Sequence, residues 1–221
     1  KQPIMKSYNT PLGELQVKVF GHASLLLQIN EKKIYVDPYS EVADYTNMPL
    51  ADAIIITHDH YDHYDESAYS KIATDKTTFI VSKQIGNVDK RYIALGYGET
   101  CEYAGIVVKA VPAYNINRRN EEGNHFHPKG FGNGYLLDFG GFKVYIAGDT
   151  EPVEEMKQLP HLDIAFLPKN LPYTMTDEEF ADLANMLKPE VLYPIHYFEL
   201  DYPSLAEKLE DKITFIDPKE E

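Results

Sequence analysis

Three histidines and two aspartates are crowded into one short stretch of the sequence, Thr57-His58-Asp59-His60-Tyr61-Asp62-His63. Side chains at positions i and i+2 of an extended or turning segment can point the same way, so His58 and His60 can hold one ion through their imidazole nitrogens. Asp62 and His63 lie beside that pair in the sequence, where they can hold a second ion. Imidazole and carboxylate ligands together suit Zn²⁺ or a similar first-row ion. Alternatively, these residues are solvent-exposed polar residues of a loop with no further role. However, three of the chain's eight histidines fall within six residues, which favours a metal site.

Two isolated polar residues elsewhere in the chain can join this cluster. Asp149 follows an apolar segment, 143–146, that we expect to be a strand, and His196 follows another, 191–194. Ligands from distant parts of a sequence converge where strands end at one edge of a sheet. Taken alone, Asp149 could instead cap a helix before Glu151, and His196 could be a buried, hydrogen-bonded histidine. Together with the histidine cluster, both are candidate metal ligands.

The segments that must position these residues predict mostly β-structure. Apolar residues alternate or run together in short bursts between turn residues, which is typical of strands. We expect strands at 15–20, 24–29, 33–36, 53–57, 78–81, 106–111, 135–139, 143–146, 163–167, 191–194 and 213–216. We expect helices at 152–158, 177–187 and 204–209, and one more between the histidine cluster and Ala73. Residues 114–133 show neither the helical nor the strand period of apolar residues. They predict a long loop, which in a compact domain is usually functional.

The length and the order of these elements indicate one α/β domain that spans residues 1–221. Single α/β domains commonly run to ~200–250 residues. Hairpins and strand-then-helix units occur in both halves, and no linker or internal repeat divides the chain. We therefore expect two sheets with helices on their outer faces. A chain of this size can bury a core without disulfides or a structural metal, so any bound metal should be functional.

The composition argues against several classes of protein. The chain has 21 Lys and Arg against 35 Asp and Glu, a net charge of −14, whereas affinity for nucleic-acid backbones comes from Lys and Arg. The single cysteine, Cys101, allows neither an intramolecular disulfide nor a thiolate metal cluster. No apolar run approaches the ~18 residues needed to span a membrane, so we expect a soluble chain.

The compartment stays open at this point. The sequence begins at Lys1 rather than Met, so we expect a preceding segment to have been removed. If that segment was a signal peptide, the protein is periplasmic or secreted; otherwise it is cytoplasmic. The oligomeric state is not indicated by the sequence.

The motif His-x-His-x-Asp-His after an apolar strand resembles the metallo-β-lactamase fold superfamily of metallohydrolases. The resemblance extends over nearly the whole chain, through Gly21-His22-Ala-Ser24, Val36-Asp37-Pro38, Ala147-Gly148-Asp149-Thr150 and Tyr193-Pro-Ile-His196-Tyr197. The order and spacing are most similar to the branch that contains ascorbate-6-phosphate lactonase and N-acyl-phosphatidylethanolamine phospholipase D-type enzymes. The resemblance implies a four-layered α-β-β-α sandwich of two mixed sheets with a dinuclear metal site at one sheet edge.

This resemblance also implies roles for individual residues. It implies two divalent ions per chain, zinc first and manganese or iron as alternatives, held by the following ligands: His58, His60, Asp62, His63, Asp149 and His196. Asp149 would bridge the two ions, and His196 would be the last ligand of the second. Asp37 would orient a ligand histidine by accepting the proton of its other ring nitrogen. His22 is expected beside the pocket rather than as a ligand.

The sequence departs from the family pattern at one ligand. In the nearest branch the third histidine of the first metal often stands in Pro-Ala-x-His, whereas this chain has Asn115 at that position. An amide is a poor zinc ligand compared with imidazole, so His127 in the long loop is the better substitute. His125 lies two residues away, but Pro128 restricts the backbone beside His127. Asn115 is kept as a pocket residue or weak ligand.

A dinuclear site predicts hydrolysis by a water whose pKa the two metals lower. Asp62 would orient or deprotonate that water while also serving as a ligand. The expected substrate is a small molecule with a polar ester, lactone or phosphodiester bond. Arg118, Tyr173 and Tyr197 are expected to bind it, because Arg and Tyr donors can hold a phosphate or carboxylate. Arg118 could equally be a solvated loop charge.

Two other functions are compatible with the same motif. A metal-binding or sensor protein would result if the first metal site had decayed at Asn115. A nuclease of the same superfamily shares the motif, but such enzymes normally carry a basic arm or domain. A chain of 221 residues with a net charge of −14 leaves no room for one, so we do not expect nucleic acid as a partner.

Overall fold

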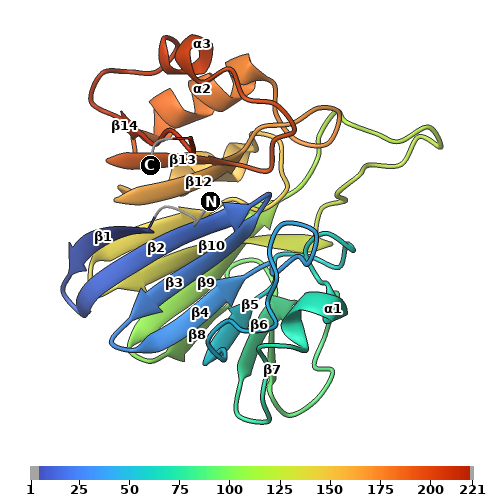
Figure 1. Cartoon of the computed structure of the whole chain (residues 1–221). Coiled ribbons are helices and arrows are strands. Elements are labelled where there is room, and N and C mark those ends of the chain that lie inside the picture. Colours follow the sequence, from blue (N-terminus) through green and yellow to red (C-terminus); the bar gives the residue numbers. More distant parts are fainter. Residues whose placement is uncertain (1–4, 220–221) are drawn as a thin grey trace.

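Two seven-stranded sheets packed face to face form the centre of the computed structural model, which describes residues 5–219 (Figure 1). The first sheet contains, in spatial order, β1 (Met5–Thr10), β2 (Gly13–Gly21), β3 (Ser24–Ile29), β4 (Lys32–Val36), β5 (Ala53–Ile55), β6 (Thr78–Ser82) and β7 (Tyr92–Leu95). The second contains β14 (Thr214–Phe215), β13 (Val191–Ile195), β12 (Ile164–Pro168), β11 (Phe142–Ile146), β10 (Gly132–Phe139), β9 (Ile106–Ala113) and β8 (Thr100–Tyr103).

Both sheets are mixed, and they are built in the same way. In the first sheet β1 to β4 pair antiparallel and β4 to β7 pair parallel. In the second sheet β8 to β11 pair antiparallel and β11 to β14 pair parallel. Parallel strands end at a common edge, so each sheet brings several loops together at the ends of its parallel strands.

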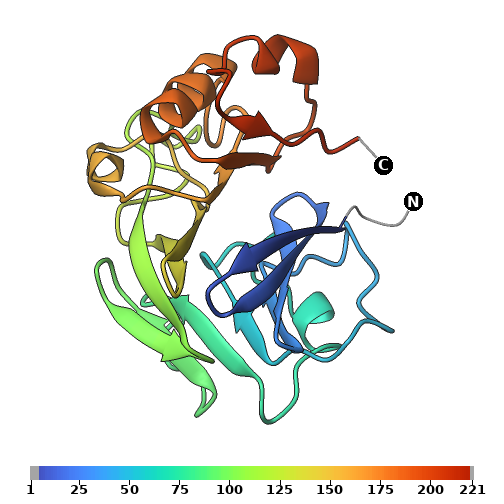
Figure 2. The same cartoon turned by 90° about the vertical axis from the view of Figure 1, so that its left-hand side faces the viewer.

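Helices cover the outer faces unevenly. The second sheet is covered by α2 (Asp177–Leu187), α3 (Tyr202–Ala206) and the 3₁₀ helix η1 (Glu154–Gln158), and the first by a single turn, α1 (Glu66–Tyr69), with the loop that follows β4 (Figure 2). Thr176 and Glu179 form a reciprocal capping box that starts α2. Phe180, Leu183 and Ala184 on the buried face of α2 pack in the same cluster as strand residues of the second sheet.

The core between the sheets consists of inward-facing aliphatic and aromatic side chains from both of them. Two hydrogen bonds of tyrosine hydroxyls cross this layer. The hydroxyls of Tyr8 in β1 and Tyr193 in β13 lie 2.6 Å apart, and Tyr135 in β10 donates to the Ile56 carbonyl at 2.8 Å. The second contact fixes the chain just after β5, where the histidine cluster begins.

The predicted fold class, a four-layered α-β-β-α sandwich of two mixed sheets, is confirmed, but some elements differ from expectation. The strand β1 was not predicted, because it is an edge strand with no buried side chain and therefore no apolar pattern. The predicted helix at 152–158 is wrong in its first residues, since Val153 is extended and only the 3₁₀ turn η1 follows. That turn ends at Gln158, and Leu159 is extended because it precedes Pro160, where a helical conformation is disfavoured.

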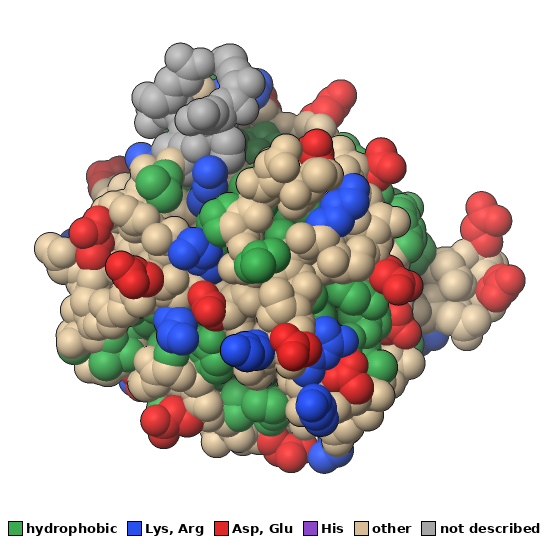
Figure 3. Space-filling view, turned by 60° about the horizontal axis from the view of Figure 1, so that its bottom comes forward, with side chains coloured by type: hydrophobic (Ala, Val, Ile, Leu, Met, Phe, Trp, Pro, Cys, Tyr) green, Lys and Arg blue, Asp and Glu red, His purple; other side chains and the backbone are tan. Residues whose placement is uncertain are grey.

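The described residues include no helix long and apolar enough to cross a membrane. The face in Figure 3 mixes Lys and Arg with Asp and Glu among small hydrophobic areas. No broad apolar surface is visible on that face.

Candidate metal centre

The histidine cluster begins where the chain leaves β5, and hydrogen bonds hold this segment in place. The Asn133 backbone N–H donates to the Thr57 carbonyl at 2.8 Å, which ties the segment to β10. The buried Asp37 carboxylate, just after β4, accepts from the Thr57 N–H at 2.8 Å and from the Thr57 hydroxyl at 2.6 Å. Gly132 is also required here, because a Cβ at that position would lie 2.6 Å from the Cβ of His58.

The first group of ligand atoms consists of His58, His60 and His127, whose ring nitrogens lie within 4.8 Å of one another. His58 and His60 follow β5, whereas His127 comes from the long loop before β10. His58 Nδ1 lies 2.8 Å from the Thr57 hydroxyl, and its Nε2 is buried without a hydrogen-bond partner among the described residues. This unpaired nitrogen is available to bind a metal.

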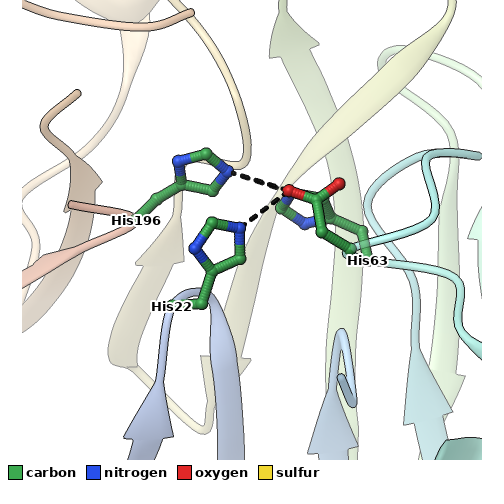
Figure 4. A group of neighbouring side chains, drawn as sticks. His22, His63 and His196 are labelled. Atoms are coloured by element: carbon green, nitrogen blue, oxygen red, sulfur yellow. Dashed lines mark hydrogen bonds and ion pairs between the residues drawn. The ribbon is translucent and has the colours of Figure 1, made fainter. Parts of the chain in front are cut away.

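The second group consists of His22, Asp62, His63 and His196, again with ligand atoms within 4.8 Å of one another. The three imidazoles converge from separate parts of the chain (Figure 4). His22 lies in the turn between β2 and β3, and its carbonyl accepts a hydrogen bond from the His196 N–H at 2.9 Å. His22 Nε2 lies 2.7 Å from Asp62 Oδ2. The sequence placed His22 beside the pocket, and the geometry makes it a further candidate ligand.

Asp149 lies between the two groups. Its Oδ2 is 3.2 Å from His127 Nε2 in the first group, and 3.2 Å and 3.0 Å from His63 Nε2 and His196 Nε2 in the second. The same oxygen is 3.6 Å from His58 Nε2, and the other oxygen, Oδ1, is buried without a partner in the described structure. One carboxylate is therefore within reach of ions held by either group.

The electrostatics of the centre favour a bound cation. Burial lowers the pKa of His58 well below its ordinary value, and burial also lowers the pKa of His60. Burial alone would raise the pKa of Asp149, but the neighbouring imidazoles, His196 first, outweigh it and hold that pKa well below its ordinary value. Hydrogen bonds to imidazoles overcome burial in the same way at Asp62. Ionised carboxylates and neutral imidazoles bind divalent metals, so the two carboxylates, His58 and His60 are in their binding state. Burial alone would lower the pKa values of His63 and His196, but the neighbouring carboxylates, Asp149 first, outweigh it and raise them, so a metal at the second group would displace protons.

The residues present therefore fit a metal centre with nitrogen and oxygen ligands. Three observations support this: a buried unpaired imidazole nitrogen, a buried unpaired carboxylate oxygen, and two groups of convergent donors. Buried polar atoms without partners are rare in folded proteins unless a ligand satisfies them. The donor set of imidazoles with few carboxylates is typical of zinc and other first-row ions.

Like His58, two further ligand histidines have an oxygen acceptor behind Nδ1. His63 Nδ1 donates to Asp37 Oδ2 at 2.7 Å, which turns His63 Nε2 toward Asp149. His127 Nδ1 lies 3.0 Å from Asn115 Oδ1, the same oxygen that accepts from the His127 backbone N–H at 2.6 Å. An acceptor on Nδ1 fixes the tautomer that leaves the Nε2 lone pair free for a metal.

This arrangement separates the roles of His127 and Asn115, which the sequence left open. His127 contributes its ring to the first group, whereas Asn115 lies behind it and donates through Nδ2 to the Tyr173 carbonyl at 2.9 Å. The geometry therefore favours His127 as the ligand and Asn115 as the residue that orients it.

A cavity of about 360 Å³ opens above the centre. Its floor is formed by side chains of the two groups and Asp149, namely His22, His60, Asp62, His127, Asp149 and His196. Its walls are aromatic, namely Tyr39, Tyr61, Phe126, Tyr173 and Phe198. The cavity is large enough for a small molecule that contacts the candidate ligands directly.

Of the expected substrate-binding residues, His22 and Tyr173 line this cavity, whereas three others do not. Asn115 is buried behind His127, and Tyr197 is half-buried outside the lining. Arg118 is turned away from the cavity, because its guanidinium pairs with Glu151 at 2.6 Å and with Glu179.

Glu151 is a buried residue whose importance the sequence did not reveal. One of its carboxylate oxygens accepts the backbone N–H groups of Ile116, Asn117 and Arg118 at 2.6 to 3.1 Å. These bonds tie the start of the long loop to the segment that carries Asp149. The only signal in the sequence is an acidic residue two positions after Asp149, which equally suits a helix start.

Comparison with known proteins relates this arrangement to a family. Residues 16–196 match a family model described as a beta-lactamase superfamily domain. A UPF0173 metal-dependent hydrolase of Thermococcus onnurineus is 30% identical over 199 residues, which cover 83% of this chain and 84% of that protein. The crystal structure of a candidate metal-dependent hydrolase from Parabacteroides distasonis is 40% identical, with a TM-score of 0.90 and 97% of each chain covered. A metallo hydrolase of Ignicoccus hospitalis shares the fold with a TM-score of 0.72 at 22% identity, covering 93% of this chain and 96% of that one.

The sandwich of two mixed sheets, with clustered histidines and aspartates at the strand ends, defines the class of metal-dependent hydrolases built on the metallo-β-lactamase fold. The chain belongs to the metallo-β-lactamase superfamily and, within it, to the UPF0173 group of metal-dependent hydrolases. The resemblance to this superfamily inferred from the motifs is thereby confirmed.

Proposed function

We propose that the chain holds two divalent ions, zinc first, and hydrolyses a small molecule at an ester, lactone or phosphodiester bond. The observation that carries this proposal is the position of Asp149 Oδ2, within 3.2 Å of His127 in one group and of His63 and His196 in the other. A single carboxylate oxygen that faces two groups of ligands suits a bridge between two ions.

The proposed reaction adds water across the scissile bond. When bound, the two ions would supply a water of lowered pKa and polarise the carbonyl or phosphoryl oxygen under attack. The water oxygen forms a bond to the acyl carbon or phosphorus, the bond to the leaving oxygen breaks, and one water proton passes to that leaving oxygen. No further reactant is needed.

Asp62 is the residue of this chain that we assign to the water. It lines the cavity, and its Oδ2 is 3.3 Å from His63 Nε2 and 2.7 Å from His22 Nε2. A carboxylate oxygen in this position can orient the attacking water and accept its proton, with His22 stabilising the carboxylate. Asp37 acts further back, because it contacts His63 and Thr57 and not the cavity.

The number of bound ions tests the proposal directly. Protein stripped of metal, reloaded with zinc and freed of excess ion should contain two ions per chain by mass spectrometry. His127→Ala should retain about one, because it removes a ligand from the first group only. His161→Ala is the matched control, since that exposed histidine pairs with Glu190 away from the centre, and it should retain two.

Hydrolysis is then measured on the same preparations with 4-nitrophenyl esters, aliphatic lactones and bis(4-nitrophenyl) phosphate. We expect zinc-dependent turnover of at least one class, and loss of about 10²-fold or more in Asp62→Asn. One ion per chain in the unmodified protein would contradict the dinuclear site and favour a weakened first group. Two ions without turnover of any class would contradict the hydrolase.

A further inference from the structure

The walls of the cavity consist of two groups of aromatic rings. The rings of Phe126 and Tyr173 meet edge to face with centroids 4.8 Å apart, and Tyr173 in turn lies 6.4 Å from Phe198. Tyr39 and Tyr61 form a second edge-to-face pair at 6.1 Å. Each of these rings lines the space above the candidate ligands.

Two of these rings form an exposed rim. Phe198 is 70% exposed and Tyr61 is 78% exposed, although both line the cavity. Large apolar side chains that stay in water at the mouth of a site gain free energy when a ligand covers them. The rim therefore favours a ligand with an apolar part that extends out of the cavity.

No Lys or Arg side chain lines this cavity in the described part of the chain. Three cations in the chain segments that carry lining residues are paired with acids. Arg118 pairs with Glu151 and Glu179, Lys129 with Glu155 at 3.1 Å, and Lys169 with Asp177 at 2.9 Å.

A substrate with a charged group away from its scissile bond is therefore disfavoured. A remote phosphate or carboxylate would be desolvated against aromatic rings without a cationic partner, which costs free energy. It would also approach a chain with a net charge of −14. Uncharged oxygens can still be bound, because Tyr39, Tyr61 and Tyr173 bring hydroxyl groups to the walls.

Resting on the hydrolase function proposed above, we propose that the aromatic cavity selects esters and lactones whose non-reacting part is apolar and uncharged, such as a short acyl chain or an aromatic ring. The acyl or aromatic group contacts Phe126, Tyr173 and Phe198, while the scissile bond lies over the candidate ligands. Hydrolysis of such an ester by one water yields one carboxylic acid and one alcohol.

The first test compares two esters that differ by one remote charge, 4-nitrophenyl butyrate and 4-nitrophenyl hemisuccinate, on zinc-loaded protein. We expect kcat/KM to be at least about tenfold higher for the butyrate. Phe198→Ala should raise KM for the butyrate several-fold with little change for the hemisuccinate. Phe198→Arg should reduce or reverse the preference for the butyrate over the hemisuccinate, because it adds a cation at the rim.

Val88→Ala is the matched control, because Val88 is an exposed apolar residue outside the cavity. It should leave the preference unchanged. Equal rates for the two esters, or a preference for the hemisuccinate in the unmodified protein, would overturn the proposal.

A binding measurement separates this inference from the hydrolase function. Calorimetry compares phenylacetate with 4-carboxyphenylacetate, which adds a second, remote carboxylate. We expect phenylacetate to bind at least about tenfold more tightly, and Phe198→Ala to lose most of that difference. Absent or equal binding of the two acids would overturn the selectivity. Retained selectivity without turnover of any ester would support the cavity assignment and contradict only the hydrolase.

Discussion

At the scale of single residues, the centre depends on which ring nitrogen of each histidine is free. An oxygen on Nδ1 decides this in three cases: the Thr57 hydroxyl behind His58, Asp37 behind His63, and Asn115 behind His127. The acceptor behind His127 is a neutral amide rather than a carboxylate, so His127 is oriented without the added basicity that an anion would give it. Asn115 thus stands where the family pattern has a ligand histidine, and its side chain instead orients the ligand His127.

Asn115 gives a prediction at this scale. Asn115→Leu removes the oxygen behind His127, so zinc affinity at the first group should fall about 10- to 100-fold while the second group is unaffected. Asn115→Asp keeps an oxygen in place and should restore most of the affinity. Competition titration with a chromophoric chelator measures both sites in one experiment.

The outcome for Asn115→Leu also distinguishes support from ligation. Unchanged zinc affinity would show that His127 is held by the loop alone. Equal losses at both groups would instead indicate a general loss of folding, which circular dichroism of the same sample detects.

At the scale of elements, every candidate ligand, and Asp37 that supports one of them, lies just beyond a strand or in a loop between two strands. Asp37 follows β4, the histidine cluster follows β5, and Asp149 and His196 follow β11 and β13. The left-handed conformation of Gly148 makes the turn into Asp149, where a Cβ would lie 2.8 Å from the Asn133 carbonyl. Only His127 depends on a long loop, so that loop needs an anchor of its own.

Glu151 is that anchor, and it gives a prediction about the loop. Glu151→Gln keeps the shape but removes a buried charge that accepts three backbone N–H bonds and pairs with Arg118. We expect the free energy of unfolding to fall by about 3 kcal/mol. Denaturant titration measures the loss, and hydrogen exchange should show faster exchange at the amides of 116–118.

The matched control is Glu154→Gln, because the Glu154 side chain is 81% exposed and its one ion pair among residues 5–219 is with the exposed Lys157. A change within about 0.5 kcal/mol is expected there. If the two variants were equally stable, the buried carboxylate would not be the anchor of the loop.

At the scale of the whole molecule, the centre lies where the two sheets meet. His22, Asp37 and the residues of 57–63 come from the first sheet, and His127, Asp149 and His196 come from the second. Ions bound here would connect the two halves of the sandwich. They would also satisfy the buried imidazole nitrogen of His58 and the buried carboxylate oxygen of Asp149, which have no hydrogen-bond partner among the described residues. Metal binding should therefore be linked to folding stability.

Metal removal gives the prediction at this scale. At a free zinc concentration about 1,000 times the dissociation constant, binding to the folded state alone contributes about 4 kcal/mol. For a chain of this size we expect the melting temperature to rise by about 8–16 °C over chelated protein in differential scanning calorimetry. The zinc-dependent rise in melting temperature should be smaller in Asp149→Asn and unchanged in His161→Ala. An identical melting temperature with and without zinc would contradict metal binding at the joint of the sheets.

Much of the fold and of the centre could be predicted from the sequence because these features depend on residues that are close together in the chain. Buried strands are apolar runs, and two sheets with outer helices were expected from their order, whereas the four-layered sandwich was implied by the resemblance to the metallo-β-lactamase superfamily. The motif from His58 to His63 holds several candidate ligands within one loop, and Asp149 and His196 each follow an apolar strand. The strand β1 carries little apolar pattern because it is an exposed edge, and it escaped prediction for that reason.

The remaining features depend on contacts between distant segments, and only the tertiary structure decided them. The sequence cannot show that Asn115 accepts from His127, that His22 reaches Asp62, or that Arg118 is paired with Glu151. Each of these contacts forms because loops from different strands meet at one edge, and loop paths have no periodic signature. The residue types at the centre were therefore set by the sequence, whereas the division of roles among them was set by how the two sheets pack.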